Sequence, residues 1–276
     1  MAEEESQWVV EPIDEAATQA AIEAENDSDA SVDDDDREDN GKKRTMTARK
    51  RARLEKMNKE AKRKRHARFT RNPMHGMQTE SCERQAESLQ GMLSSAACSL
   101  DTLSAADFIS PNVLPKDRAI SDSALAVKAI QKDWRKKLLG PVHPCAGSLG
   151  APVLLVVTYA ATRAVDFVRA LKPLQNKKAA IAKLFAKHIK VDEQIAALNA
   201  DVRIAVGTPN RLLRLFDAGA LSASSLEHVV IDMGLDAKQM NLFDIAAVRD
   251  DFLGLFSKYL HANLLSCGGN IRLCLY

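Results

Sequence analysis

The chain has 276 residues, of which 46% are hydrophobic and 28% are charged, and its formal net charge is only +2. This length accommodates one domain of ordinary size with extensions. No apolar run is long enough to cross a membrane, and the five cysteines lack paired C-x-x-C spacing, which argues against a disulfide framework and a zinc site. We therefore expect a soluble intracellular protein without a bound metal.

The small net charge conceals two N-terminal segments of opposite sign. Residues 1–40 contain sixteen acidic side chains and one basic side chain, Arg37. This composition cannot bury enough apolar surface to offset the entropy of ordering, so we expect a disordered acidic tail. Residues 41–71 contain fifteen Lys and Arg against Glu55 and Glu60, which predicts a basic arm that neutralises phosphates.

Clusters within the basic arm are typical of nuclear and nucleolar localisation signals and of RNA contacts. The residues predicted to direct localisation are Lys42, Lys43, Arg44, Arg49, Lys50 and Arg51. The residues predicted to bind RNA are Lys62, Arg63, Lys64 and Arg65. The alternative interpretation is a solvated tail whose only task is nuclear import.

Two segments precede the main run of strands and helices. Residues 72–120 are predicted to be a partly ordered linker, with an ambiguous helix over 78–100. Residues 121–139 are predicted to form one helix with an apolar stripe, and this helix begins a domain that spans 121–276.

Strands and helices alternate from residue 150 onwards, which predicts an α/β fold with a parallel sheet flanked by helices. Short Val- and Ile-rich runs mark the strands, as expected where both faces of a sheet are covered. The predicted strands are 152–158, 179–185, 203–207, 227–231 and 270–275. The predicted helices are 161–171, 191–200, 211–218 and 244–260. The run 179–185 is the exception, since its alanines and Lys183 also suit a helix.

A Gly-Thr-Pro turn joins the third predicted strand to its helix. Pro209 suits the first helical turn, Thr208 precedes it as a candidate cap, and Gly207 allows a ligand to approach the backbone. A helix N-terminus at the carboxyl end of a strand favours phosphate, and Arg211 adds a charge one turn inside. The alternative is that this sequence is only a good strand-to-helix turn.

Several segments together resemble the DEAD-box RNA helicases. The run from Gly207 to Leu213 is similar to the G-T-P-G-R-L-L element of that family, 161–165 stands where the family has P-T-R-E-L, and 229–232 resembles the strand that leads into the D-E-A-D box. The resemblance covers roughly residues 150–276 and implies a single RecA-like domain related to P-loop nucleoside triphosphatases. The RNA-binding residues that it implies are Thr162, Arg163, Gly207, Thr208, Pro209, Asn210 and Arg211.

The departures from the helicase pattern bear on catalysis. The chain contains no G-x-x-x-x-G-K-T segment to cradle phosphates, and the D-E-A-D position reads Asp232-Met233-Gly234-Leu235. Asp232 either holds a metal-bound water or caps the segment that follows it. A second RecA domain is not expected, since the chain ends at Tyr276. We therefore predict no catalytic residues, no cofactor and no small-molecule substrate; the alternative is an ATP-dependent RNA helicase.

The chain as a whole is similar to the Cms-one type of ribosomal small-subunit protein, a degenerate DEAD-box relative of the early nucleolar pre-ribosome. The similarity rests on the acidic start, the basic segment, the run 184–190 and the G-T-P-x-R element. It implies a non-catalytic nucleolar factor for small-subunit assembly and pre-rRNA processing, with pre-ribosomal RNA and assembly factors as partners and no membrane association. The alternative is a scaffold whose RecA-like face binds another assembly factor while RNA contacts only the tail.

Overall fold

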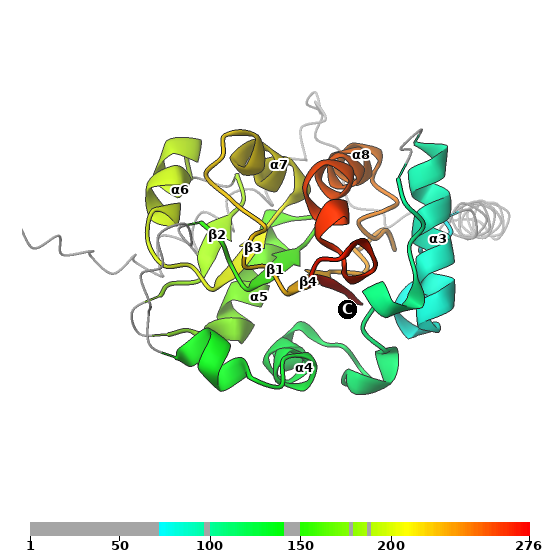
Figure 1. Ribbon diagram of the computed structural model, residues 1–276, viewed down its shortest axis with the longest axis horizontal. Helices are drawn as coiled ribbons and strands as arrows, with labels where there is room; N and C mark the ends of the chain where they lie inside the picture. The colour runs from blue at the N-terminus through cyan, green and yellow to red at the C-terminus, as the bar shows by residue number, and fades with distance from the viewer. Residues whose placement is uncertain (1–71, 97–99, 141–149, 177–178, 187–188) are drawn as a thin grey trace, which may run out of the picture. The chain divides into compact units, whose positions relative to one another are not determined.

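A computed structural model of the protein describes residues 72–96, 100–140, 150–176, 179–186 and 189–276 (Figure 1). The predicted acidic tail and basic arm, with all of their localisation residues and with Lys62, Arg63, Lys64 and Arg65, lie outside the described residues. Those predictions therefore stay predictions.

Five strands form one sheet in the order β2-β3-β1-β4-β5, and every pairing is parallel. The strands are β1 (Leu154–Val157), β2 (Ala182–Leu184), β3 (Ile204–Gly207), β4 (His228–Ile231) and β5 (Arg272–Leu275). Nearly all of their residues are buried, because helices cover both faces of the sheet. The predicted α/β class with a parallel sheet is confirmed.

Alternate residues along each strand belong to two separate cores. In β1, Leu155 and Val157 pack in one core, whereas Leu154 and Val156 pack in the other. The first core includes residues of α3 (Cys82–Ser95), α6 (Val191–Leu198), α7 (Pro209–Asp217) and α8 (Ala246–Leu255), and the second includes residues of α4 (Ser123–Ile130) and α5 (Ala161–Leu171). Figure 1 shows α6, α7 and α8 on one side of the sheet and α4 and α5 on the other, with α3 standing beyond the edge of the sheet near the C-terminus.

The segment predicted as a partly ordered linker contributes to the core of the sheet. Helix α3 begins after Ser81, whose hydroxyl accepts a hydrogen bond from Arg84 N, and its Leu89 and Leu93 are fully buried. Phe108 forms a parallel bridge with Leu273 of the edge strand β5. The buried core therefore extends well to the N-terminal side of residue 121.

The single helix predicted over 121–139 is two elements instead. Helix α4 ends at Ile130, and a π-helical turn follows at Arg135–Leu139. Gln131 lies between them in an extended conformation, and its buried amide donates a hydrogen bond to Glu227 Oε2 at 3.0 Å. The break brings this polar side chain to the start of β4, a contact that helical periodicity cannot anticipate.

The remaining predicted elements are present with shifted ends. The ambiguous run 179–185 contains the edge strand β2 and no helix, and the exposed side chain of Lys183 projects from it. The predicted helix 244–260 divides into α8 and a π-helical turn at Phe256–Leu260. Helix α7 begins at Pro209, two residues before the predicted start.

Candidate functional site

The strand order creates one switch point, between the neighbouring strands β1 and β4. The connection after β1 leads towards β2, and the connection after β4 leads the opposite way to β5. Open α/β sheets bind their ligands in the crevice outside the carboxyl ends of such strands. Thr158 follows β1 and Asp232 follows β4, so both lie at this point, and their side chains are hydrogen-bonded at 2.9 Å. We therefore take this position as the candidate site.

Every acceptor position of the Asp232 carboxylate is occupied by a protein donor. Arg163 binds it through two hydrogen bonds, from Nε to Oδ2 and from Nη2 to Oδ1, both at 2.6 Å. The Thr158 hydroxyl donates to Oδ2, and the Gly234 backbone N–H donates to Oδ1 at 3.0 Å. A carboxylate offers about four lone-pair directions, so Asp232, which is 1% exposed, has none left for a ligand.

Arg163, predicted to contact RNA, is the ion-pair partner of Asp232. It extends from the first turn of α5, and its guanidinium lies 5.3 Å from the ring centre of Tyr159. Burial alone would lower the pKa of Arg163, but the hydrogen bonds and charge of Asp232 outweigh burial and raise it. The guanidinium is thus a fixed, internally paired cation.

Gly234 is the residue that makes room for this pair. A Cβ atom there would lie 1.9 Å from Arg163 Nη2 and 2.9 Å from Asp232 Oδ1. Met233, at the position of the helicase glutamate, is buried in the first core, and its N–H donates to Tyr276 O. Of the two roles considered for Asp232, the structure displays the capping one, because Asp232 accepts the Gly234 N–H.

Arg211, the other arginine predicted to contact RNA, also faces inwards. Its side chain is 7% exposed, and Nη1 donates to Ile189 O at 2.9 Å and to Gln194 Oε1 at 2.8 Å. The Gln194 amide in turn donates to Lys183 O and Phe185 O at the end of β2. Burial lowers the pKa of Arg211. This arginine joins the start of α7 to α6 and to the edge strand.

The Gly-Thr-Pro turn is packed against protein atoms. A Cβ at Gly207 would lie 2.5 Å from Leu184 O and 2.8 Å from Leu212 Cδ2, so this glycine allows the strand and helix to approach each other, where a ligand was expected. Thr208 is the N-cap residue of α7, but its hydroxyl makes no capping hydrogen bond, contrary to the prediction. Pro209 is buried in the first turn of α7, where proline is tolerated.

Three predicted contacts keep accessible side chains. Thr162 and Asn210 are exposed, and Thr208 is half-buried. Asn210 donates to Asp251 Oδ2 of α8 at 3.1 Å, and it lies inside α7 with ordinary helical backbone. The structure therefore brings the predicted residues to the same edge of the sheet but turns both arginines away from solvent. Sequence reasoning missed Thr158, Tyr159 and Gly234 as members of the site.

Other features of the described residues offer no competing site. They include no group of three or more His, Cys, Asp or Glu placed to hold a metal. No helix in the described part of the chain is long and apolar enough to span a membrane.

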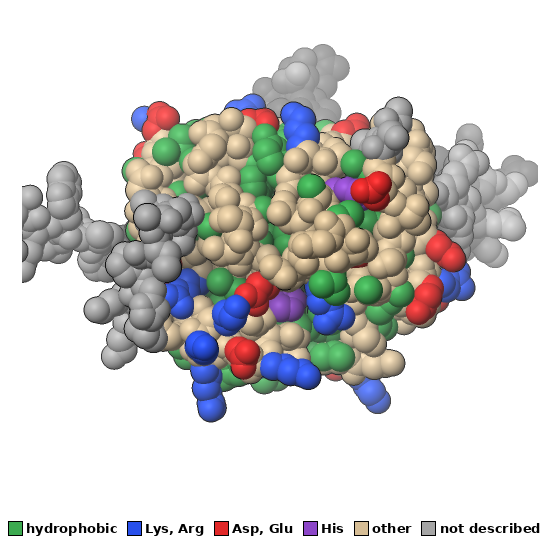
Figure 2. Space-filling view, viewed as in Figure 1, with side chains coloured by type: hydrophobic (Ala, Val, Ile, Leu, Met, Phe, Trp, Pro, Cys, Tyr) green, Lys and Arg blue, Asp and Glu red, His purple; other side chains and the backbone are tan. Residues whose placement is uncertain are grey.

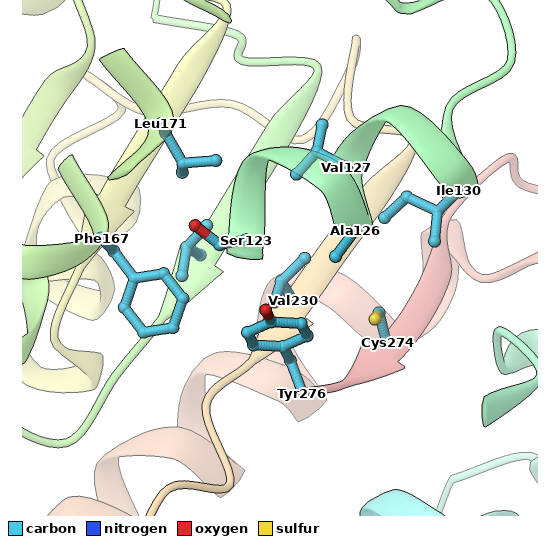
Figure 3. Close-up of a pocket in the computed structure, with 10 residues that line it drawn as sticks. Ser123, Ala126, Val127, Ile130, Phe167, Leu171, Val230, Cys274 and Tyr276 are labelled. Atoms are coloured by element: carbon cyan, nitrogen blue, oxygen red, sulfur yellow. The ribbon is translucent and has the colours of Figure 1, made fainter. Parts of the chain in front are cut away.

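An apolar pocket beneath α4 has a volume of about 10 Å³, enough for one water at most (Figure 3). A groove of about 740 Å³ between α3 and α8 is open and mixed in polarity.

Comparison with known proteins gives one family and several relatives. The family model CMS1, described as "U3-containing 90S pre-ribosomal complex subunit", matches residues 29–276. Protein CMS1 of Chaetomium thermophilum is 47% identical over 98 residues, which cover 35% of this chain and 39% of that protein. Protein CMSS1 of Danio rerio is 37% identical over 127 residues, covering 45% and 42% respectively. Human Protein CMSS1 is 34% identical over 105 residues, or 37% of each chain. The matched region spans about two fifths of the length of these relatives.

Proposed function

Because this chain belongs to the CMS1 family, described as a U3-containing 90S pre-ribosomal complex subunit, we propose that it is a non-catalytic, RNA-binding factor in assembly of the small ribosomal subunit. Pre-ribosomal RNA and other assembly factors are then its partners, and the nucleolus is its place of action.

The single observation that carries the non-catalytic part of the proposal is the saturation of Asp232. A nucleoside triphosphatase of the helicase type needs an acidic side chain that can reach magnesium or an attacking water. Here that carboxylate is enclosed by Arg163, Thr158 and Gly234, and releasing it would leave the largely enclosed guanidinium of Arg163 unpaired. Breaking a buried ion pair on one side costs about 3–5 kcal/mol, which favours a structural role for Asp232.

The RNA-binding part of the proposal rests on charge. Residues 41–71 carry fifteen Lys and Arg against two Glu, a composition suited to a phosphate backbone. The same clusters would serve as the nucleolar address. The carboxyl edge of the sheet offers little further positive charge for RNA binding, because Arg163 and Arg211 both bind acceptors within the protein.

Salt dependence of RNA affinity tests the proposal. We expect the full chain to bind a uridine oligonucleotide, and the logarithm of the association constant to fall linearly with the logarithm of salt concentration. For single strands the slope is about −0.7 for each phosphate contact, so six contacts give about −4. Replacing Lys62, Arg63, Lys64 and Arg65 with glutamine should make the slope less negative. Affinity that is independent of salt would contradict the proposal.

The inward orientation of the two arginines gives the scaffold interpretation a specific basis. If the sheet edge does not contact RNA, it is free to bind another assembly factor. Ultraviolet crosslinking of the full chain to RNA separates the two interpretations, because a scaffold predicts adducts confined to residues 41–71. Adducts on the folded domain favour an RNA-binding role for that domain.

A further inference from the structure

A second concentration of positive charge lies on the folded domain, away from the carboxyl edge of the sheet. Between residues 128 and 137 there are five Lys and Arg and a single acidic residue, Asp133. Lys137 is paired with Glu227. The other four cations form no ion pair with any residue in the described part of the chain; they are Lys128, Lys132, Arg135 and Lys136.

The packing of α4 determines which side of this segment faces solvent. Ala126, Val127 and Ile130 line the small pocket over the sheet together with Val230 and Cys274 (Figure 3). Positions on the opposite side of the helix are left exposed, including Leu125 at 59%. Figure 2 shows Lys and Arg side chains spread along the lower part of the view, over α4 and the turn that follows it. The side chains of Lys132, Arg135 and Lys136, in the segment that follows α4, are also exposed to solvent.

An aromatic ring lies among these cations. The Lys128 ammonium is 4.9 Å from the ring centre of Trp134, and the Arg135 guanidinium carbon is 5.2 Å from it. Trp134 is only partly buried, with one part of the ring packed against the second core. Proteins that bind single-stranded nucleic acid combine these two features, a row of cations for phosphates and an aromatic face for bases.

Hydrogen bonds and an ion pair fix the segment from residue 128 to residue 140 to the sheet domain. Gln131 and Lys137 both bind the carboxylate of Glu227, and Arg203 donates to Lys137 O at 2.7 Å. Asn176 donates to Leu139 O and Gly140 O at 3.0 and 2.7 Å. These contacts tie both ends of the segment to the sheet domain, so its backbone needs no ordering on binding and only the side chains of the cations lose freedom.

We propose that this surface, formed by Lys128, Lys132, Trp134, Arg135 and Lys136 and called here the α4 basic surface, binds the phosphate backbone of single-stranded RNA with a base against Trp134. The proposal rests on the RNA-binding function proposed above and locates part of that function on the folded domain. Lys128 and Arg135 lie over the ring of Trp134, so a base that contacts the ring takes the place of one of these cations and leaves it to pair with a phosphate. RNA supplies both the base and the phosphate, whereas an acidic protein segment supplies only negative charge.

Trp134 provides a local probe of this surface. The chain has two tryptophans, so in a full-length Trp8→Phe protein all tryptophan emission comes from Trp134. A uridine oligonucleotide should quench that emission in a saturable manner as it binds. Fluorescence anisotropy of the labelled oligonucleotide measures total RNA binding in the same samples.

Charge removal then tests whether the surface carries affinity. In the triple variant, Lys132, Arg135 and Lys136 are all replaced by glutamine. Loss of three phosphate contacts should weaken binding about tenfold or more at 0.1 M salt and make the salt slope less negative by about 2. The matched control replaces three exposed lysines at other places, Lys183, Lys190 and Lys238, and should change affinity by less than about twofold, since these groups make no proposed contact.

Each outcome has a separate meaning. Equal affinity of the triple variant and the parent would overturn the surface while leaving RNA binding by the chain intact. Failure of the full chain to bind the oligonucleotide at all would overturn the proposed function, and this inference with it. Stronger quenching of Trp134 by a polyglutamate peptide than by RNA would assign the surface to an acidic protein. If the triple variant has a lowered melting temperature, the single variants Lys132→Gln and Lys136→Gln replace it, each with an expected loss of about threefold.

Discussion

Asp232 determines how the site is interpreted at the level of single residues. The sequence placed this carboxylate after a buried strand and left open whether it holds a metal-bound water or caps the next segment. The structure adds two partners, Thr158 and Arg163, that lie 74 and 69 residues away in the sequence. Neither periodicity nor a local motif identifies partners so distant. The capping role was predictable because an Asp two residues before a glycine N–H is a local pattern.

Gly234 should be intolerant of any side chain. We expect Gly234→Ala to lower the free energy of unfolding by about 2–4 kcal/mol, because the new Cβ would clash with the Arg163 guanidinium and separate the ion pair. Urea denaturation measures the change. Gly91→Ala in α3 is the matched control, since no atom lies within 4 Å of its Cβ position, and it should stabilise by up to about 1 kcal/mol. Equal stability of Gly234→Ala and the parent would contradict the packing described here.

His228 should make stability depend on pH. Burial lowers its pKa to about 4, although the nearby Glu227 acts in the opposite direction. The folded state therefore favours the neutral imidazole, and the unfolded chain binds the proton more tightly. Stability from this group is fully present above pH about 6.5 and is lost as the pH falls towards 4, by up to about 3 kcal/mol.

The corresponding measurement compares urea midpoints at pH 7 and pH 4.5. His228→Gln, which cannot titrate, should show a smaller loss between these two pH values than the parent. Parallel losses in the two proteins would mean that other groups account for the acid sensitivity.

At the level of elements, the sequence identified most of the sheet and few of its side-chain contacts. All five strands lie within predicted runs. The runs of β1, β3 and β4 are rich in Val or Ile and bounded by turn residues, a pattern typical of buried strands, whereas β2, Ala-Lys-Leu, also suited a helix. The prediction of a single helix over 121–139 was wrong, because the chain leaves the helix at Gln131, whose side chain binds Glu227. Helical periodicity carries no information about that distant acceptor. For the same reason the inward orientation of Arg211 could not be predicted.

Arg211 joins three elements, so its loss should affect folding more than RNA affinity. Arg211→Gln removes donors from Ile189 O and Gln194 Oε1, and we expect a loss of about 1–3 kcal/mol in unfolding free energy. RNA affinity of the folded variant should change by less than about twofold, because the guanidinium makes no phosphate contact in this account. Asn210→Ala, at an exposed neighbouring position, is the control and should cost about 0.5 kcal/mol or less. A variant of normal stability with weakened RNA binding would restore Arg211 as an RNA contact.

At the level of the whole molecule, the buried core of the described residues includes side chains from the segment 72–120, ahead of the predicted domain start at 121. A fragment of residues 72–276 should unfold in one cooperative transition. A fragment of residues 121–276 lacks Leu89, Leu93 and Phe108, each fully buried in the first core. Losing one such side chain costs about 2–5 kcal/mol, so losing all three costs about as much as the whole stability of a typical domain, about 5–15 kcal/mol.

Calorimetry distinguishes the two fragments. The shorter one should show no cooperative transition, whereas the longer one should retain the melting temperature of the folded domain. A cooperative transition in residues 121–276 would confirm the domain boundary predicted from the sequence and would assign α3 to a separable layer.

Two sets of cations in the described part of the chain differ in their environment. Arg163 and Arg211, at the carboxyl edge, are engaged inside the fold. Lys128, Lys132, Arg135 and Lys136 form no ion pair with the described residues, and we propose that they bind RNA. An α/β domain of this arrangement keeps a sheet edge typical of ligand binding, but it fills that edge with its own side chains. The central claim is therefore that the switch point between β1 and β4 is closed.

The most direct test of that claim is steady-state ATP hydrolysis by the purified full chain with magnesium, in the presence and absence of saturating RNA. With a closed switch point we expect a rate equal to that of the buffer in both conditions, while the same preparation binds RNA. Hydrolysis that rises with RNA and with the concentration of the protein would show that the switch point is open, because Asp232 and its neighbours would then have to accept a nucleotide.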